Sequence, residues 1–253
     1  MLGFFFRHYD DIVERYVVFD DGSTDDSLEL LRAHPRVDLR SMPPYADPDS
    51  RVRSGQALQE HCWKESRGAA DWVIVTDVDE HLYHPNLASY LAGCLDKGVT
   101  AIPSLGYRML AEEFPQAGVR LSERVVRGQP TTHYSKMNIF SPDAIEATNY
   151  GLGRHTAQPL GRVVLPPRDE LILLHFRYLG FERTHRRHQE YLTRQRAKDL
   201  ENGWGIQYSW SREKLREVWD GISGGLIDVV SPDLRPWETH PGPRWWTEHP
   251  RVS

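Results

Sequence analysis

Residues 71 to 85, DWVIVTDVDEHLYHP, place three carboxylates within four positions. Asp77, Asp79 and Glu80 repel one another unless a cation or protons lie between them. Carboxylate oxygens are the ligands that hard divalent cations prefer. The D-x-D spacing of Asp77 and Asp79 therefore predicts a site for a divalent metal ion.

Another acidic turn lies earlier in the chain, in VVFDDGSTD at residues 17 to 25, and it also follows an apolar run. In chain order we call it the first turn, and the turn with Asp77, Asp79 and Glu80 the second turn. Gly22 lets the backbone turn sharply behind Asp20 and Asp21. The same sequence makes a good turn and helix cap in any protein, so taken alone it supports a structural role as well as a binding role. Whether it has a binding role depends on whether the fold brings it close to Asp77 and Asp79.

Both turns follow segments that have the pattern of buried strands. Residues 72 to 75 are apolar and rich in β-branched side chains, as in a strand covered on both faces of a parallel sheet. Strands and helices alternate in this half, which predicts an α/β fold of the Rossmann-like kind, with right-handed βαβ units and a mostly parallel sheet flanked by helices. Ligands of such sheets bind at the carboxyl ends of the strands, so we expect both turns at one cleft. The predicted strands are 15 to 19, 37 to 41, 72 to 76 and 99 to 105, and the predicted helices are 1 to 14, the segment ending near 33, 53 to 66 and 86 to 95.

The second half of the chain is less regular. Strands are predicted in MNIF, GRVVL and ELILLHFRY, and helices at residues 181 to 200 and 211 to 220. The segment from Ser231 to the end is rich in Pro, Trp and His, and we expect it to wrap the surface or to be partly mobile.

Composition excludes several classes of protein. The formal charge of −5 has both signs interspersed, which leaves no footprint for nucleic acid. The two cysteines are in no metal-ligand spacing, and no apolar run reaches the length of about 18 residues that a transmembrane segment needs. No signal peptide is visible, so we expect a soluble, cytoplasmic protein without a transmembrane segment.

The motif DDGSTD followed by a D-x-D at the end of a later strand resembles the GT-A glycosyltransferases of the family 2 type, over residues 1 to about 195. The resemblance implies that Asp20 and Asp21 receive the base and ribose of a nucleotide sugar. It also implies that Asp77 and Asp79 face the ribose and a Mn²⁺ or Mg²⁺ ion that bridges the diphosphate. The implied GT-A domain, residues 1 to 200, has a nucleotide half (1 to 105) and an acceptor half (106 to 200). Residues 201 to 253 follow as a helix and a tail.

Further candidates lie in the acceptor half. His175, in LILLHFRYLGF, matches a segment in which a late histidine completes the metal shell of related enzymes, and its alternative role is a core histidine. His155 is a second such candidate. Lys136 and Arg177 are predicted to neutralise diphosphate or acceptor charge, with a solvated surface role as the alternative. His185 and His188 lie in a basic helix and are predicted to face solvent.

An inverting transfer also needs a carboxylate that takes the proton of the acceptor hydroxyl. Glu112 and Glu113, after the strand at 99 to 105, are the first choice, and Glu123 and Glu146 are alternatives. A retaining mechanism stays open.

GT-A domains usually begin with a strand before their first helix, whereas this chain opens within the helix. The missing strand would lie beside the strand at 15 to 19. Either it lies upstream, or the sheet is rearranged, or the domain is impaired. The leading prediction is a metal-dependent transferase that moves a sugar from a nucleotide donor to the hydroxyl of a glycan, lipid or small molecule. Its rivals are a non-catalytic nucleotide or carbohydrate binder, and a sugar-nucleotide pyrophosphorylase, which would need a glycine-rich basic loop that the sequence lacks.

Overall fold

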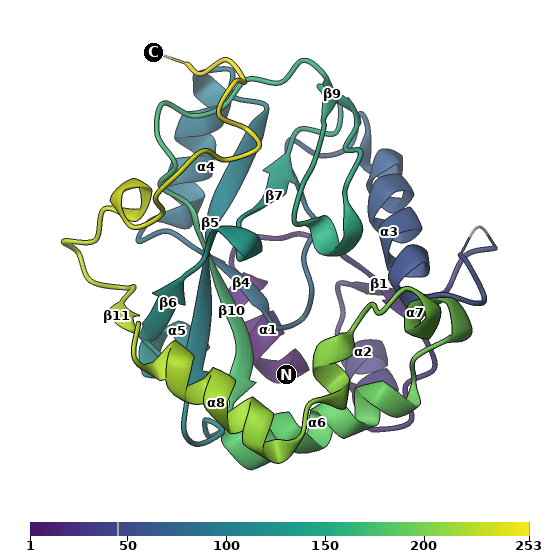
Figure 1. The fold of residues 1–253 in the computed structure, drawn as a ribbon. Coiled ribbons are helices and arrows are strands. Elements are labelled where there is room, and N and C mark those ends of the chain that lie inside the picture. The colour runs from purple at the N-terminus through teal and green to yellow at the C-terminus, as the bar shows by residue number, and fades with distance from the viewer. Residues whose placement is uncertain (45, 253) are drawn as a thin grey trace.

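A computed structural model describes residues 1 to 44 and 46 to 252, and Figure 1 shows helices arranged around a curled central sheet. The predicted α/β class is therefore confirmed. Within the described residues, no helix combines the length and the apolar character needed to cross a lipid bilayer.

The bounds of the elements are as follows. The α-helices are α1 (Leu2–Tyr9), α2 (Ser27–Ala33), α3 (Arg51–His61), α4 (Leu87–Asp96), α5 (Leu121–Arg124), α6 (Phe181–Thr193), α7 (Ala197–Glu201) and α8 (Arg212–Ser223). The 3-10 helices are η1 (Cys62–Ser66), η2 (Thr132–Tyr134), η3 (Leu152–Arg154), η4 (Ile206–Ser209) and η5 (Pro236–Glu238). The strands are β1 (Tyr16–Asp20), β2 (Val37–Ser41), β3 (Val73–Ile74), β4 (Glu80–Tyr83), β5 (Ala101–Ala111), β6 (Arg127–Pro130), β7 (Lys136–Phe140), β8 (Ile145–Ala147), β9 (Leu160–Gly161), β10 (Ile172–Leu179) and β11 (Ile227–Asp228).

The main sheet is mixed, so the prediction of a mostly parallel sheet is wrong. Its seven strands include β11, β6, β5, β10 and β4 in that order, and β7 connects β5 to β3. Only β5 and β10 are parallel in this sheet, and its other pairs among the described residues are antiparallel. A second parallel pair, β1 with β2, stands apart as a two-stranded sheet.

The mixed sheet follows from how its strands are connected. The chain passes from β5 to β6 and on to β7 with only α5 and η2, each a single short turn, in between. Parallel neighbours need a crossover of about a dozen residues or more, usually a helix, whereas antiparallel neighbours do not. Residues 110 to 136 were predicted to form a long loop region, but they contain β6, which pairs with β5. The strand predicted in MNIF is present as β7, which also pairs with β5.

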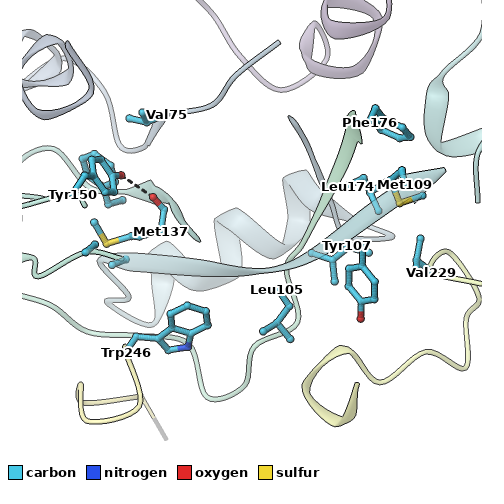
Figure 2. Close-up of a cluster of buried hydrophobic side chains, with 14 of the residues drawn as sticks. Val75, Leu105, Tyr107, Met109, Met137, Tyr150, Leu174, Phe176, Val229 and Trp246 are labelled. Carbon is cyan, nitrogen blue, oxygen red and sulfur yellow. Dashed lines mark hydrogen bonds between the residues drawn. The ribbon is translucent and has the colours of Figure 1, made fainter. Parts of the chain in front are cut away.

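The central strands β5 and β10 hold the core together. Figure 2 shows Leu105, Tyr107 and Met109 of β5 beside Leu174 and Phe176 of β10. These side chains alternate along each strand and are almost completely buried, which fixes the register of the parallel pair. The same pair carries His175 within β10, and Glu112 and Glu113 directly follow the end of β5.

Helix α1 covers the outer edge of β4. The Tyr9 hydroxyl accepts a hydrogen bond from the Leu82 backbone N–H at 2.9 Å and donates to the Glu80 carbonyl oxygen at 2.9 Å. The His8 Nε2 atom lies 2.8 Å from the Leu82 carbonyl oxygen. The edge strand therefore has its backbone groups satisfied by side chains.

The tail after Ser231 packs against the core. Trp246 is only 1% exposed, and its Nε1 atom donates to Asp169 Oδ2 at 3.2 Å. The His240 Nε2 atom lies 2.8 Å from the Gly106 carbonyl oxygen on β5. The tail is thus anchored to the main sheet at more than one point.

Candidate functional site

Glu80 is the most firmly held of the three acids in the second turn. It begins β4, its side chain is fully buried, and it forms ion pairs with Lys136 and Arg154. Arg154 Nη2 donates to Glu80 Oε2 at 2.5 Å, and Arg154 Nη1 donates to the Val75 carbonyl oxygen at 2.6 Å. Burial raises the pKa of Glu80, but the charges of Arg154 and Lys136 outweigh it and hold that pKa well below its usual value. Glu80, Lys136 and Arg154 form what we call the buried ion cluster.

A strained backbone places Arg154 in this cluster. Gly153 and Arg154 have φ angles of 63° and 60°, in the left-handed region that non-glycine residues rarely adopt. The Arg154 side chain is 0% exposed. Sequence reasoning missed this residue and singled out its neighbour His155, although the glycine before Arg154 was a local signal of unusual backbone.

Asp79 and His175 come together at the edge of the main sheet. β4 and β10 pair so that Glu80 lies opposite His175, and the Phe176 backbone N–H donates to the Asp79 carbonyl oxygen at 2.8 Å. The His175 Nε2 atom lies 3.6 Å from Asp79 Oδ2. Burial raises the pKa of the Asp79 carboxyl, but the His175 imidazole lowers it more, to about 2.

The spacing of these two side chains suits two ligands of one ion. At 3.6 Å the contact is too long for a good hydrogen bond. Two atoms that each bind the same ion at about 2.1 Å lie roughly 3.0 to 3.6 Å apart. Of the metal ligands predicted from the sequence, the structure therefore brings Asp79 and His175 together.

Asp77 is more exposed and has a different partner. Its side chain is 55% exposed, and its Oδ2 atom lies 3.3 Å from Arg154 Nη2. Within the described residues, no group of three or more His, Cys, Asp or Glu side chains is arranged to hold a metal ion. A metal at Asp79 and His175 would take further ligands from substrate oxygens and water, as Mg²⁺ commonly does.

The first acidic turn is built largely from its own backbone. The Asp20 carboxylate accepts hydrogen bonds from the Gly22 and Ser23 backbone N–H groups at 3.0 and 3.1 Å. Gly22 has φ 79°, so the sharp turn predicted there is present. Asp21 pairs with Arg196 Nη2 at 2.7 Å and lies 3.7 Å from Arg51 Nε. A nucleoside that approaches this turn therefore meets carboxylates that already have partners.

The amino terminus lies near both acidic turns. Burial lowers the pKa of the Met1 amino group, and so do the charges of Arg183 and Arg187 on α6. Asp25 of the first turn and Asp79 of the second act on the same amino group in the opposite sense. One residue of each turn and two arginines of α6 therefore act on the same amino group.

Helix α6 brings half-buried arginines to the region of that amino group. Arg183 and Arg187 are one helical turn apart, and among the described residues neither forms an ion pair with a carboxylate. Burial and the neighbouring Arg187 lower the pKa of Arg183 to about 10. The Arg183 guanidinium carbon lies 4.1 Å from the ring centroid of Phe114. Cations crowded in this way favour the binding of an anion.

The other predicted residues have varied surroundings. Lys136 is bound to Glu80, so its charge already has a partner. Glu112 is exposed and accepts a hydrogen bond from Trp219 Nε1 at 2.9 Å, and Glu113 is exposed directly after it. Within the described residues, neither glutamate forms a hydrogen bond or an ion pair with Asp79 or with the other acid of the D-x-D.

The histidines of the acceptor half differ in burial, and only His175 and His188 are buried. His155 stacks on His133 with ring centroids 3.9 Å apart, and burial together with Lys136 lowers its pKa to about 3. The prediction that His188 faces solvent is wrong, because this residue is only 3% exposed. His188 points inward because α6 packs against η4 on that side.

A surface cleft of about 390 Å³ lies between α3 and the segment before η3. Its lining includes Asp47, Arg53, Gln56, Glu60 and Tyr150. None of the four acids predicted from the two turns lines it. The cleft is therefore a neighbour of the first turn's partner Arg51 and not part of the Asp79–His175 site.

No protein-family model matches the chain, and a comparison with curated proteins finds no match either.

Proposed function

We propose that this protein is a metal-dependent glycosyltransferase of the GT-A type, which moves a sugar from a nucleotide-diphosphate donor to an acceptor hydroxyl with inversion. The observation that carries the proposal is the pair formed by Asp79, directly before β4, and His175, in the middle of β10, whose side-chain atoms lie 3.6 Å apart. Beside this pair stand the arginines of α6, which have no carboxylate partner among the described residues.

The donor set of this pair fits Mn²⁺ or Mg²⁺. Asp79 offers a carboxylate with a low pKa, and His175 offers a nitrogen, which favours Mn²⁺ over Mg²⁺. When bound, the metal supplies positive charge that stabilises the departing diphosphate. Asp79 and His175 would hold the metal. Asp77 would bind it through a water molecule or would contact the donor directly.

The remaining steps belong to side chains of this chain. Arg183 and Arg187 bind phosphate oxygens, since guanidinium groups match phosphate geometry. Asp20 and Asp21 orient the base and ribose. Gly22 makes the sharp turn that follows them, before α2 begins. The buried ion cluster fixes the second turn through the ion pairs of Glu80.

The proton of the acceptor hydroxyl goes to a carboxylate after β5. Glu112 and Glu113 are the candidates, because the strand end delivers them to the side of the sheet where β10 turns into α6. Of the two, Glu113 is free of the Trp219 hydrogen bond that occupies Glu112. Glu113 therefore takes the role of general base in this proposal.

A second candidate is a non-catalytic binder of sugar nucleotides. The observation in its favour is the first turn, where Asp20 is used by its own backbone and Asp21 by Arg196. Such a protein would bind a nucleoside diphosphate with Mn²⁺ and release no product.

The test is the release of nucleoside diphosphate from a panel of nucleotide sugars with Mn²⁺, with and without simple glycosides as acceptors. We expect release by the wild type and a loss of at least a hundredfold in Asp79→Asn. The matched control is Asp96→Asn, an exposed aspartate at the end of α4, which should act as the wild type does. Binding without release from any donor would favour the non-catalytic binder.

A further inference from the structure

Two arginines at the centre of the main sheet have no anionic partner. Arg108 of β5 lies opposite His175 in the parallel register, and Arg177 follows two residues later on β10. Among the described residues, neither side chain takes part in a hydrogen bond or an ion pair. The Arg108 Nε and Arg177 Nη2 atoms are nevertheless buried.

Aromatic rings hold both guanidinium groups in place. The Arg108 guanidinium carbon lies 5.3 Å from the ring centroid of Tyr134, and that of Arg177 lies 5.4 Å from the ring of Tyr208. Gly106 makes the first contact possible, because a Cβ atom there would lie 2.3 Å from the Tyr134 backbone. The segment that carries Tyr134 therefore fits closely against β5, and each guanidinium group lies against an aromatic ring.

His188 adds a third unpartnered group to the same region. It is 3% exposed, and neither of its ring nitrogens has a hydrogen-bond partner among the described residues. Its ring centroid lies 5.6 Å from that of Tyr208, the ring that also contacts Arg177. Arg177 and His188 are therefore neighbours through Tyr208, which both side chains contact.

Arg108 and Arg177 are half-buried, and one nitrogen of each guanidinium is buried without an acceptor, which calls for an explanation. Proteins normally pair a buried charge or hydrogen-bond it, and an unsatisfied buried group points to a missing ion, water or ligand. Arg154 in this chain follows that rule, since its fork binds Glu80 and a carbonyl oxygen. Arg108 and Arg177 lack such a partner, and a guanidinium fork matches a carboxylate or a phosphate.

We propose that Arg108, Arg177 and His188 form a subsite for an acidic group, a carboxylate or a phosphate, carried by one of the two sugars in the transfer. That the acidic group belongs to a sugar rests on the proposed function. In the proposed function the donor diphosphate is bound by Asp79, His175 and the arginines of α6. The three side chains adjoin that position, since Arg108 lies opposite His175 and the charge of Arg177 lowers the pKa of Asp79, and they form a subsite beside it. The acid is carried either by the transferred sugar or by the acceptor.

Calorimetry with matched probes tests the proposal and separates the two sources. UDP-glucuronate is compared with UDP-glucose in the presence of Mn²⁺, and glucuronate and glucose 6-phosphate are each compared with glucose. We expect at least one acidic probe to bind tenfold or more tightly than its neutral match. A preference within the UDP pair assigns the acid to the transferred sugar, and a preference confined to the free sugars assigns it to the acceptor.

Variants connect the preference to these residues. Arg108→Gln and Arg177→Gln should each reduce the preference for the acidic probe to less than threefold, while the exposed Arg124→Gln should keep it. Should a glutamine variant fail to fold by circular dichroism, Arg108→Lys and Arg177→Lys retain the charge without the planar fork, and we expect a partial loss of preference.

Equal binding of acidic and neutral probes would overturn the proposal, as would a preference that survives in both arginine variants. The transferase proposal is judged separately. If UDP binds with Mn²⁺ while acidic and neutral sugars bind equally, the transferase proposal is supported and the subsite proposal is wrong. If glucuronate binds tightly through Arg108 and Arg177 but no nucleotide binds, the acid subsite is supported and the transferase proposal is wrong.

Discussion

The two acidic turns of this protein look alike in sequence but are held in different ways. In the first turn, Asp20 is fixed by the backbone N–H groups of the next residues and Asp21 by arginines near the surface. In the second turn, Glu80 lies at the centre of a fully buried ion cluster. The first is a local structure, whereas the second depends on contacts with residues 56 and 74 positions away.

The three acids of the second turn therefore have different roles. Glu80 is structural, Asp77 is exposed and shares Arg154, and Asp79 is next to His175. Because its ion pairs with Lys136 and Arg154 fix Glu80, the preceding residue Asp79 is positioned next to His175 without a ligand. A preorganised ligand position is what tight metal binding requires.

The largest expected effect comes from breaking the buried ion cluster. Glu80→Gln leaves Lys136 and Arg154 without their counter-charge, and removing one partner of a buried ion pair typically costs about 3 to 5 kcal/mol. Asp77→Asn is the control, because its exposed contact with Arg154 is worth less than about 1 kcal/mol. Urea unfolding of both variants measures the difference, and equal losses would contradict the structural role of Glu80.

A smaller effect is expected from the backbone that places Arg154. Gly153→Ala puts a Cβ atom at φ 63° and within 2.8 Å of the His155 ring, so we expect a loss of about 1 to 2 kcal/mol. Gly221→Ala in α8 is the matched control, since its Cβ meets nothing within 4 Å, and helix propensity predicts a gain of up to about 1 kcal/mol. Thermal unfolding of the pair gives the result. A gain in both variants would show that the left-handed turn is not under strain.

The pH dependence of Asp79 sharpens the comparison further. Its folded-state pKa of about 2 is below the unfolded value of 3.8, so its contribution to stability is present above pH 3.8 and is lost as the pH falls toward 2. The difference in unfolding free energy between the wild type and Asp79→Asn should therefore shrink below pH 4. Titration of both proteins from pH 7 to pH 2 by urea unfolding tests this. A difference that stays constant over the whole range would mean that His175 does not stabilise the Asp79 carboxylate.

The smallest expected change in stability comes from the first turn. Asp21→Asn removes ion pairs with Arg196 and Arg51 at the surface, which are worth about 1 kcal/mol or less. The melting temperature should thus change little. A large drop would show that the first turn is as deeply anchored as the second.

Local patterns in the sequence predicted some of this structure well. The apolar runs gave β5 and β10, and the glycine after two aspartates gave the first turn. Asp79 and His175 do lie together, although the prediction that His175 is at a strand end is wrong, because this residue is in the middle of β10. Each of these inferences needs only a few consecutive residues.

Other features depend on long-range pairing that no local pattern contains. The sheet is mixed because β6 and β7 both pair antiparallel with β5. The sequence between β5 and β7 has no regular pattern that predicts this pairing. Arg154 was missed because its partner Glu80 lies 74 positions earlier in the chain. The same holds for Arg108, whose significance appears only when β5 and β10 lie side by side.

The central claim is that Asp79 and His175 hold a metal whose binding is coupled to a nucleoside diphosphate. Calorimetric titration of UDP and GDP, with and without Mn²⁺, tests it most directly in the wild type, Asp79→Asn and the control Asp96→Asn. We predict that Mn²⁺ tightens nucleotide binding at least tenfold in the wild type and in Asp96→Asn, and that Asp79→Asn abolishes this coupling while keeping its fold. Unchanged affinity and unchanged metal response in Asp79→Asn would contradict the account.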